Sequence, residues 1–171
     1  MLLKRTFYYR LPQSLIAQSL THPRDMCRLM VVRWDGSISH RRFLNLPELL
    51  PKDSILVLNR TRVIPALLEA RKETGGRIEL LFVDLGGEER PKAFLKGKVR
   101  EGVSGRTPTG TEIRVMKHLR EGLFEVEVIK GEARRGEGLL TLLKEEGKTP
   151  LPPYIKRRDL PEGEYQTVYA E

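Results

Sequence analysis

Cysteine is nearly absent from this chain, since Cys27 is the only one in 171 residues. A single cysteine excludes an intrachain disulfide and a zinc site built from several cysteines. The three histidines, His22, His40 and His118, lie far apart and show no spacing typical of metal ligands. We therefore expect no metal site and no histidine-based acid–base pair.

Long apolar runs are also lacking. No stretch approaches the roughly 18 to 20 apolar residues that a transmembrane helix needs. The first residues, Met1 to Arg5, lack the apolar core and the small-residue cleavage site of a signal peptide. These absences predict a protein with no membrane partner that resides in the cytoplasm.

Basic residues are abundant and unevenly distributed. The formal net charge is +8, and residues 1–65 alone hold 11 Lys and Arg against 4 Asp and Glu, a net +7. A concentrated positive charge favours a polyanionic partner such as nucleic acid, and a basic solvated surface is the alternative.

The first 65 residues predict a few short elements. Asp35-Gly36 between alternating apolar positions indicates a hairpin of strands 29–33 and 38–43. Trp34 between them is interpreted as a packing residue, and a base-stacking platform is the alternative. A short helix is expected after Pro12 over 13–18, and another over 46–50 with Asn45 as its cap. The continuous apolar run 55–58 predicts a buried strand.

From Ala66 onward, short strands alternate with glycine-rich turns, which is typical of a small closed or half-closed β-barrel. We assign residues 66–137 to a separate domain. A helix with an apolar face is expected from Leu139, ended by Gly147. The five predicted strands are 66–71, 77–83, 92–98, 111–116 and 123–129.

Polar residues follow the predicted strand 55–58, at the end where α/β sheets usually bind ligands. Asn59 and Thr61 offer amide and hydroxyl groups, and Arg60 and Arg62 could pair with phosphate or carboxylate. The alternative is a plain turn, in which Asn59 turns the chain and Thr61 caps it.

The last segment is the strongest candidate site. Prolines 150, 152 and 153 favour an extended backbone that presents the following side chains outward. Aromatic groups suit stacking on a base, cations suit phosphates, and amide or hydroxyl groups suit a base edge. A linker between two domains is the alternative. The residues are Tyr154, Lys156, Arg157, Arg158, Tyr165, Gln166, Thr167 and Tyr169.

Several motifs resemble the S-adenosylmethionine:tRNA ribosyltransferase-isomerases of queuosine biosynthesis. The similarity spans essentially the whole chain in the family's order and spacing, although the barrel region matches by little beyond its Thr74-Gly75-Gly76 turn. The matching segments are 15–18, Pro23-Arg24-Asp25 with Arg28-Leu29, 56–59, 61–66, 150–157 and 165–170.

The resemblance implies a mixed α+β fold: a discontinuous α/β main domain, residues 1–65 and 138–171, with an inserted small antiparallel β-barrel, residues 66–137. It implies transfer and isomerisation of the ribosyl group of S-adenosylmethionine onto 7-aminomethyl-7-deazaguanine at the tRNA wobble position, giving epoxyqueuosine, adenine and methionine. S-adenosylmethionine is a co-substrate, tRNA is bound at its anticodon region, and no prosthetic group or metal is needed.

Carried over onto this sequence, the resemblance implies two groups of substrate-binding residues and assigns no catalytic base. Asn59, Thr61 and Arg62 form one wall; the other consists of Tyr154, Lys156, Arg157, Tyr165, Gln166 and Thr167.

The sequence departs from the family pattern at three single positions and at its end. Arg60 and Ser54 stand where aspartates are common, and Phe94 stands where a tryptophan is usual. The family continues beyond the segment 165–170 with motifs that do not occur here. We therefore expect an N-terminal half, with much of the S-adenosylmethionine site supplied elsewhere, for instance by a separate chain. A non-catalytic tRNA-binding module and an inert truncated paralogue are the alternatives.

Overall fold

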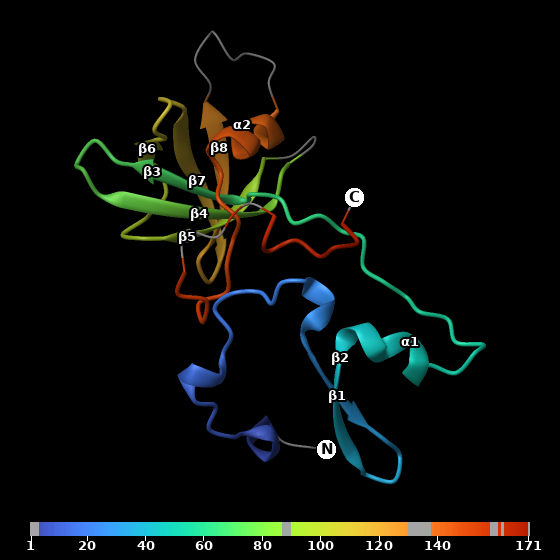
Figure 1. Ribbon diagram of the computed structural model, residues 1–171. Coiled ribbons are helices and arrows are strands. Elements are labelled where there is room, and N and C mark those ends of the chain that lie inside the picture. The colour runs from blue at the N-terminus through green and yellow to red at the C-terminus, as the bar shows by residue number, and fades with distance from the viewer. Residues whose placement is uncertain (1–3, 87–89, 130–137, 158–160, 162, 171) are drawn as a thin grey trace. The chain divides into compact units, whose positions relative to one another are not determined.

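A computed structural model describes residues 4–86, 90–129, 138–157, 161 and 163–170 (Figure 1). The chain divides into two compact units. The first unit comprises Met1–Thr61 and Pro152–Glu171, and the barrel unit comprises Arg62–Leu151. Each unit is described by itself.

The first unit has one two-stranded sheet and several short helical turns. The predicted hairpin is confirmed: β1 (Arg28–Val32) pairs antiparallel with β2 (Ile38–Arg42). At its tip, Gly36 has a φ of +80°, a conformation that glycine adopts without strain. The helical turns are η1 (Lys4–Phe7), η2 (Gln13–Leu15), η3 (Arg24–Met26), η4 (Phe43–Asn45) and α1 (Leu46–Leu49).

The predicted buried strand over 55–58 is wrong. The segment Ile55–Leu58 has no regular secondary structure, and Ile55 and Val57 are 92% and 88% exposed. An apolar run predicts burial only where neighbouring strands and covering helices exist. Among the described residues, none hydrogen-bonds to the backbone of this segment.

Three further expectations for the first unit need correction. Trp34 does not pack, because it protrudes fully from the hairpin tip. The helix expected over 13–18 is only the single turn η2. The helix predicted after Asn45 exists as α1, with Asn45 at the N-cap position. Its side chain makes no capping hydrogen bond, and its Oδ1 instead accepts one from the Arg42 amide (3.1 Å).

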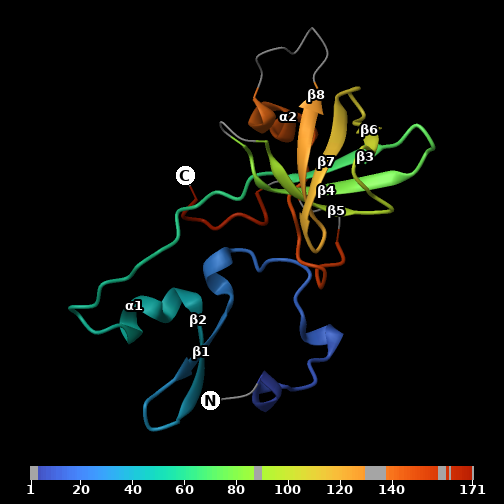
Figure 2. The same cartoon turned by 180° about the vertical axis from the view of Figure 1, so that it is seen from behind.

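The barrel unit is a closed antiparallel barrel of six strands in the order β3-β4-β5-β8-β7-β6 (Figures 1 and 2). Five strands were predicted and β6 was missed, because it is only three residues long within a glycine-rich stretch. β6 closes the barrel through the pair Arg71 and Arg106. The strands are β3 (Leu67–Arg71), β4 (Arg77–Asp84), β5 (Lys92–Lys96), β6 (Ser104–Arg106), β7 (Glu112–Arg120) and β8 (Leu123–Ile129).

Alternating apolar positions fill the barrel. On β4, Ile78, Leu80 and Phe82 point inward, and the residues between them are more exposed. The same two-residue period buries Leu68 and Ala70 on β3. Because successive side chains of a strand point to opposite faces, this pattern specifies the register of each strand.

The helix α2 (Leu139–Glu146) completes this core with Leu142 and Leu143. Gly147 ends it as predicted, although its φ of −72° is not left-handed. Glycine is needed there because a Cβ would overlap the carbonyl oxygens of Pro65 and Leu143.

The expected mixed α+β fold with a small antiparallel β-barrel is therefore confirmed. The domain limits at residues 65 and 138 remain a prediction. Within the described part of the chain, no helix is both long and apolar enough to cross a membrane.

Candidate functional site

The first unit contains a cavity of about 490 Å³ between two segments far apart in the sequence. We call it the larger cavity, because it is the larger of the two cavities described in this unit. Its volume lies within the range of small-molecule sites, roughly 300 to 1,000 Å³. A guanidinium, a carboxylate, a thiol and several hydroxyl groups come from the same walls as apolar side chains. The lining residues are Leu20, Thr21, Arg24, Asp25, Cys27, Phe43, Thr167, Val168 and Tyr169.

Local turns build both walls of the larger cavity. On one wall, the turn η3 follows Pro23, with the Met26 amide donating to the Pro23 carbonyl (3.1 Å). On the other, the Ala170 amide donates to the Thr167 carbonyl (3.2 Å). Consecutive turns present neighbouring side chains in different directions, so short segments can contribute several polar groups to one cavity.

Gln18 connects the N-terminal wall to the proline-rich segment. Its Nε2 donates to the carbonyl oxygens of Tyr154 (3.1 Å) and Ile16 (3.2 Å), and its Oε1 accepts from the Lys156 amide (2.6 Å). One amide side chain thus binds both the carbonyl of Tyr154 and the amide of Lys156, and so fixes the backbone between them. Asparagine would be one methylene too short to keep these contacts without movement of the backbone.

A smaller cavity of about 150 Å³ lies beside Gln18. Glu164 lines it, and no described residue reaches the buried Oε2 of this carboxylate with a hydrogen bond. A buried carboxylate oxygen is costly without a donor, so Glu164 is a candidate acceptor for a ligand's donor group. Leu20 lines both cavities. The other residues of the smaller cavity are Ala17, Ser19, Ile155 and Tyr165.

The structure brings only part of the predicted terminal group to these cavities. Thr167 and Tyr169 line the larger cavity, and Tyr165 lines the smaller one. Tyr154 and Lys156 have exposed side chains, and Gln18 contacts only their backbone. Arg157 and Gln166 are half-buried and line neither cavity. Arg158 lies outside the described residues.

The other predicted group lies outside both cavities. Asn59 and Thr61 are exposed, and Asn59 Oδ1 accepts a hydrogen bond from the Thr61 amide (2.8 Å). This is the plain turn that the sequence left open as the alternative. Arg62 is exposed and belongs to the barrel unit.

Several residues that line the cavities or hold their walls were not predicted as site residues from the sequence. Arg24 and Asp25 were quoted only as part of a motif, and Gln18 only as the end of another. The signal was present, because both motifs carried the resemblance without any assigned role. Glu164 gave no signal in the sequence, since its lack of a donor is visible only in three dimensions.

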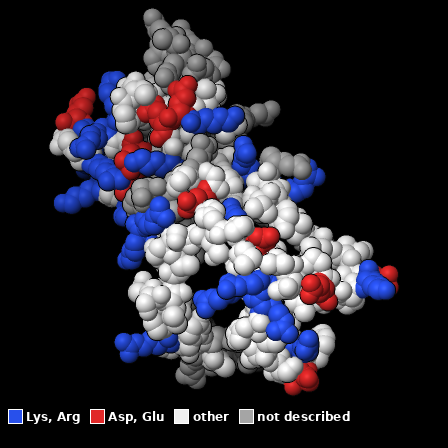
Figure 3. Space-filling view, viewed as in Figure 1, with Lys and Arg blue, Asp and Glu red and all other residues white. Residues whose placement is uncertain are grey.

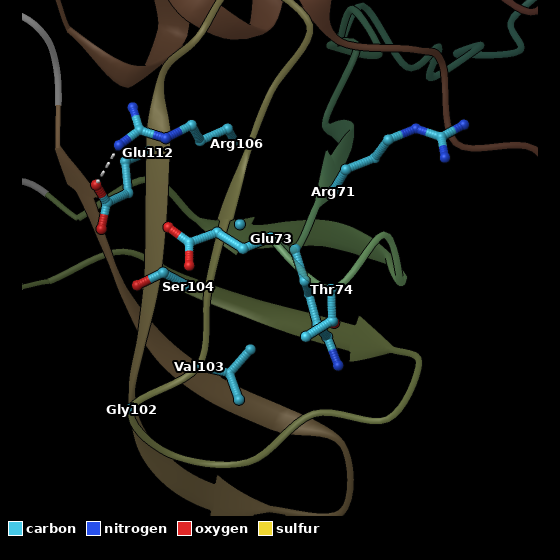
Figure 4. A pocket seen from close by; sticks show the side chains of 10 residues that line it. Arg71, Glu73, Thr74, Gly102, Val103, Ser104, Arg106 and Glu112 are labelled. Atoms are coloured by element: carbon cyan, nitrogen blue, oxygen red, sulfur yellow. Dashed lines mark hydrogen bonds and ion pairs between the residues drawn. The ribbon is translucent and has the colours of Figure 1, made fainter.

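The barrel unit has a separate cavity of about 510 Å³ between the β3–β4 turn and β6 (Figure 4). Arg106 pairs with Glu112 on one side (3.4 Å), and Arg71 lies across the cavity and points away from them. Charges of both signs line this cavity, and none of the predicted site residues does. The part of the chain that the structure describes contains no cluster of three metal-ligating side chains.

Residues 4–171 match the family described as "Queuosine biosynthesis protein". This match covers nearly the whole chain, including both walls of the larger cavity. The chain belongs to this family.

Its curated relatives carry the name S-adenosylmethionine:tRNA ribosyltransferase-isomerase. The protein of Aquifex aeolicus is 40% identical over 169 residues, which cover 96% of this chain and 49% of the relative. The protein of Rubrobacter xylanophilus is 42% identical over 164 residues, covering 95% and 47%. The chain thus spans about half the length of the curated relatives it matches.

A solved structure is also similar, the S-adenosylmethionine tRNA ribosyltransferase of Thermotoga maritima. It is 31% identical in sequence, with a TM-score of 0.36. The superposition covers 82% of this chain and 48% of that one.

Proposed function

We propose that this chain acts in queuosine biosynthesis as part of an enzyme that transfers and isomerises the ribosyl group of S-adenosylmethionine. The acceptor is 7-aminomethyl-7-deazaguanine at the wobble position of tRNA, and the product is epoxyqueuosine. The larger cavity carries the proposal, because segments 23–25 and 165–170, which bear the family resemblance, supply both of its walls.

The chemistry of the larger cavity suits part of S-adenosylmethionine. That molecule is cationic at its ammonium and sulfonium groups, has one carboxylate and carries an adenine. Asp25 can attract the cationic groups, Arg24 can pair with the carboxylate, and Phe43 offers an apolar surface to the ring. The nine lining residues supply one carboxylate, so we assign Asp25 to binding and leave the base unassigned.

The reaction requires no metal or prosthetic group, and S-adenosylmethionine is consumed as a co-substrate. The partners are tRNA, through its anticodon region, and S-adenosylmethionine. A polypeptide corresponding to the remaining half of the relatives, in the same chain or a separate one, would supply further substrate contacts. The cytoplasm contains both substrates and is the proposed location.

The test measures adenine release from S-adenosylmethionine. The chain is combined, by mixing and by fusion, with a polypeptide that covers the second half of the Aquifex aeolicus relative. We expect adenine only when the tRNA carries the aminomethyl-deazaguanine base. The two halves of the relative itself, combined in the same ways, are the positive control. Release by that control but not by this chain would contradict the proposal.

A variant addresses the cavity directly. We expect Asp25→Asn to raise the KM for S-adenosylmethionine about tenfold, the loss of one charge-assisted hydrogen bond. Asp53→Asn is the matched control, because Asp53 is exposed and lines neither cavity. Equal KM values for the two variants would remove Asp25 from the binding site.

A further inference from the structure

One face of the β1–β2 hairpin is exposed along its whole length. The register pairs Arg28 with Arg42, Met30 with His40 and Val32 with Ile38. Because every second residue of a strand points to the same side, these three pairs share one face. All six residues are exposed, and Met30, Val32 and Ile38 are each about 60% exposed. We call these six residues the ribbon face.

The ribbon face has a basic end without compensating carboxylates. Arginines 28 and 42 stand directly opposite each other, an arrangement that repulsion between like charges disfavours. Arg42 Nη1 donates to the Met26 carbonyl (3.0 Å), and neither arginine forms an ion pair with a described residue. Neither strand contains Asp or Glu. Figure 3 shows Lys and Arg side chains gathered where β1 and β2 lie in Figure 1.

An exposed aromatic side chain lies at the tip of the same hairpin. The Trp34 side chain is fully exposed, which is unusual for the only tryptophan of a protein. The nearby carboxylate of Asp35 is held in the turn, where it accepts the Ser37 amide (2.9 Å) and the pKa of Asp35 is lowered by hydrogen bonds from Ser37. The hairpin therefore combines cations at one end with an aromatic platform at the other.

We propose that the ribbon face and Trp34 form an RNA interface, distinct from the larger cavity. Arg28 and Arg42 contact phosphates of the backbone, and Trp34 stacks on an unpaired base. A bound phosphate relieves the repulsion between the two arginines, and apolar Met30 and Val32 can contact the sugars. Single-stranded RNA is recognised by cations that contact the phosphates and by aromatic side chains on which bases stack. The identity of the partner rests on the proposed function.

The test measures the affinity of the 171-residue chain for a fluorescent anticodon stem-loop RNA by anisotropy at several salt concentrations. We expect Arg28→Ala to weaken binding about tenfold and to reduce the salt slope by about one. Trp34→Ala should weaken binding by a similar factor and leave the slope unchanged, because stacking releases no counterions. Arg28→Lys should restore the slope.

Arg114→Ala is the matched control, because Arg114 is also a half-exposed strand arginine but pairs with Glu112 (3.2 Å) and Glu127 (3.8 Å) in the barrel. Equal effects of Arg28→Ala and Arg114→Ala would overturn the interface, leaving only a general charge effect. Unchanged affinity in both hairpin variants would also overturn it, and would leave the proposed reaction standing if adenine release persists. No RNA binding by the unaltered chain at low salt would count against both proposals.

Discussion

The two units differ in how they treat apolar and charged side chains. Every described residue that is fully buried lies in the barrel unit, from Ala66 to Leu143, and no described residue of the first unit is buried. The barrel unit contains several ion pairs, among them Arg77 with Glu69 and Arg114 with Glu112. In the first unit, Arg24, Arg28 and Arg33 pair with no described carboxylate. The barrel unit buries its apolar side chains and pairs many of its charges internally, whereas the first unit leaves both kinds of side chain at least partly exposed.

This difference explains where the candidate sites lie. A barrel that closes its hydrogen bonds and fills its interior is a rigid body with few unsatisfied groups. In Figure 3, acidic and basic side chains alternate over the barrel, while the basic ones predominate over the hairpin. Both cavities that contain predicted residues, and the ribbon face, belong to the first unit. The candidate binding surfaces and the stable core thus lie in different segments of the chain.

Hydrogen exchange should show the largest contrast. The amides of 55–58 have no described hydrogen bond, whereas those of β4 lie in ladders with β3 and β5. We expect the central β4 amides to exchange at least about 1,000-fold more slowly, because their exchange requires opening of the barrel. Exchange is followed residue by residue with NMR spectroscopy. Comparable protection in both segments would show that 55–58 is paired in solution.

A leucine-to-alanine substitution in each unit should change the free energy of unfolding by very different amounts. Leu68 is completely buried in the barrel core, and Leu15 is 72% exposed in the first unit. We expect Leu68→Ala to lower the free energy of unfolding by about 2 to 5 kcal/mol through lost burial and a residual cavity. Leu15→Ala should change it by less than about 0.5 kcal/mol.

The readout is urea unfolding followed by far-ultraviolet circular dichroism. Fluorescence of Trp34 would report on the first unit only, since no other tryptophan is present. Equal losses for the two leucine variants would mean that Leu15 is buried in solution and that the contrast between the units is wrong.

The sequence predicted the barrel better than the first unit, for a physical reason. In the barrel, each strand's two-residue period and each glycine turn agree with the final contacts, as on β4 with Ile78, Leu80 and Phe82. Only β6 was not predicted, because a strand of three residues is too short to show a two-residue period. In the first unit, local pattern and final environment disagree: Ile55–Leu58 reads as a buried strand and is exposed.

The site was predictable only in part. Thr167 and Tyr165 were selected for their chemistry, and they do line cavities. Asn59 was selected because it follows the predicted strand over 55–58. Since that strand does not form, the reason for placing Asn59 in a site no longer holds. Gln18 acts through hydrogen bonds to the backbone 136 and 138 residues away, which no local pattern can reveal.

Close packing at the end of α2 gives the next prediction. A Cβ on Gly147 would overlap the carbonyl oxygens of Pro65 and Leu143, whereas a Cβ on Gly138, at the other end of the helix, meets nothing within 4 Å. We expect Gly147→Ala to destabilise the barrel by about 1 to 3 kcal/mol, because backbone must move to admit the methyl group. Thermal unfolding of both variants measures this. A loss for Gly138→Ala as large as that for Gly147→Ala would point to glycine flexibility instead of contact.

The smallest effect concerns a charge network of the barrel. Glu69 Oε1 accepts from Lys148 Nζ (2.8 Å) and Arg77 Nη2 (2.6 Å), and the hydrogen bond from Lys148 is the main cause that lowers the pKa of Glu69 below 4.5. A carboxyl whose pKa is lower in the folded than in the unfolded state stabilises the fold at pH values above its pKa in the unfolded state. That stabilisation is lost as the pH falls through the pKa of the carboxyl in the folded state.

We therefore expect Glu69→Gln to lower the free energy of unfolding by about 0.5 to 1 kcal/mol at neutral pH, a modest amount because solvent screens these pairs. The difference from the unaltered chain should shrink as the pH falls below 4.5 and vanish once the folded carboxyl is protonated. In the first unit, Asp53→Asn should show no difference at either pH, since Asp53 has no described partner. A loss of unfolding free energy for Glu69→Gln that persists in acid would show that Glu69 acts through packing. The ion pairs of Glu69 would then contribute nothing to the stability of the barrel.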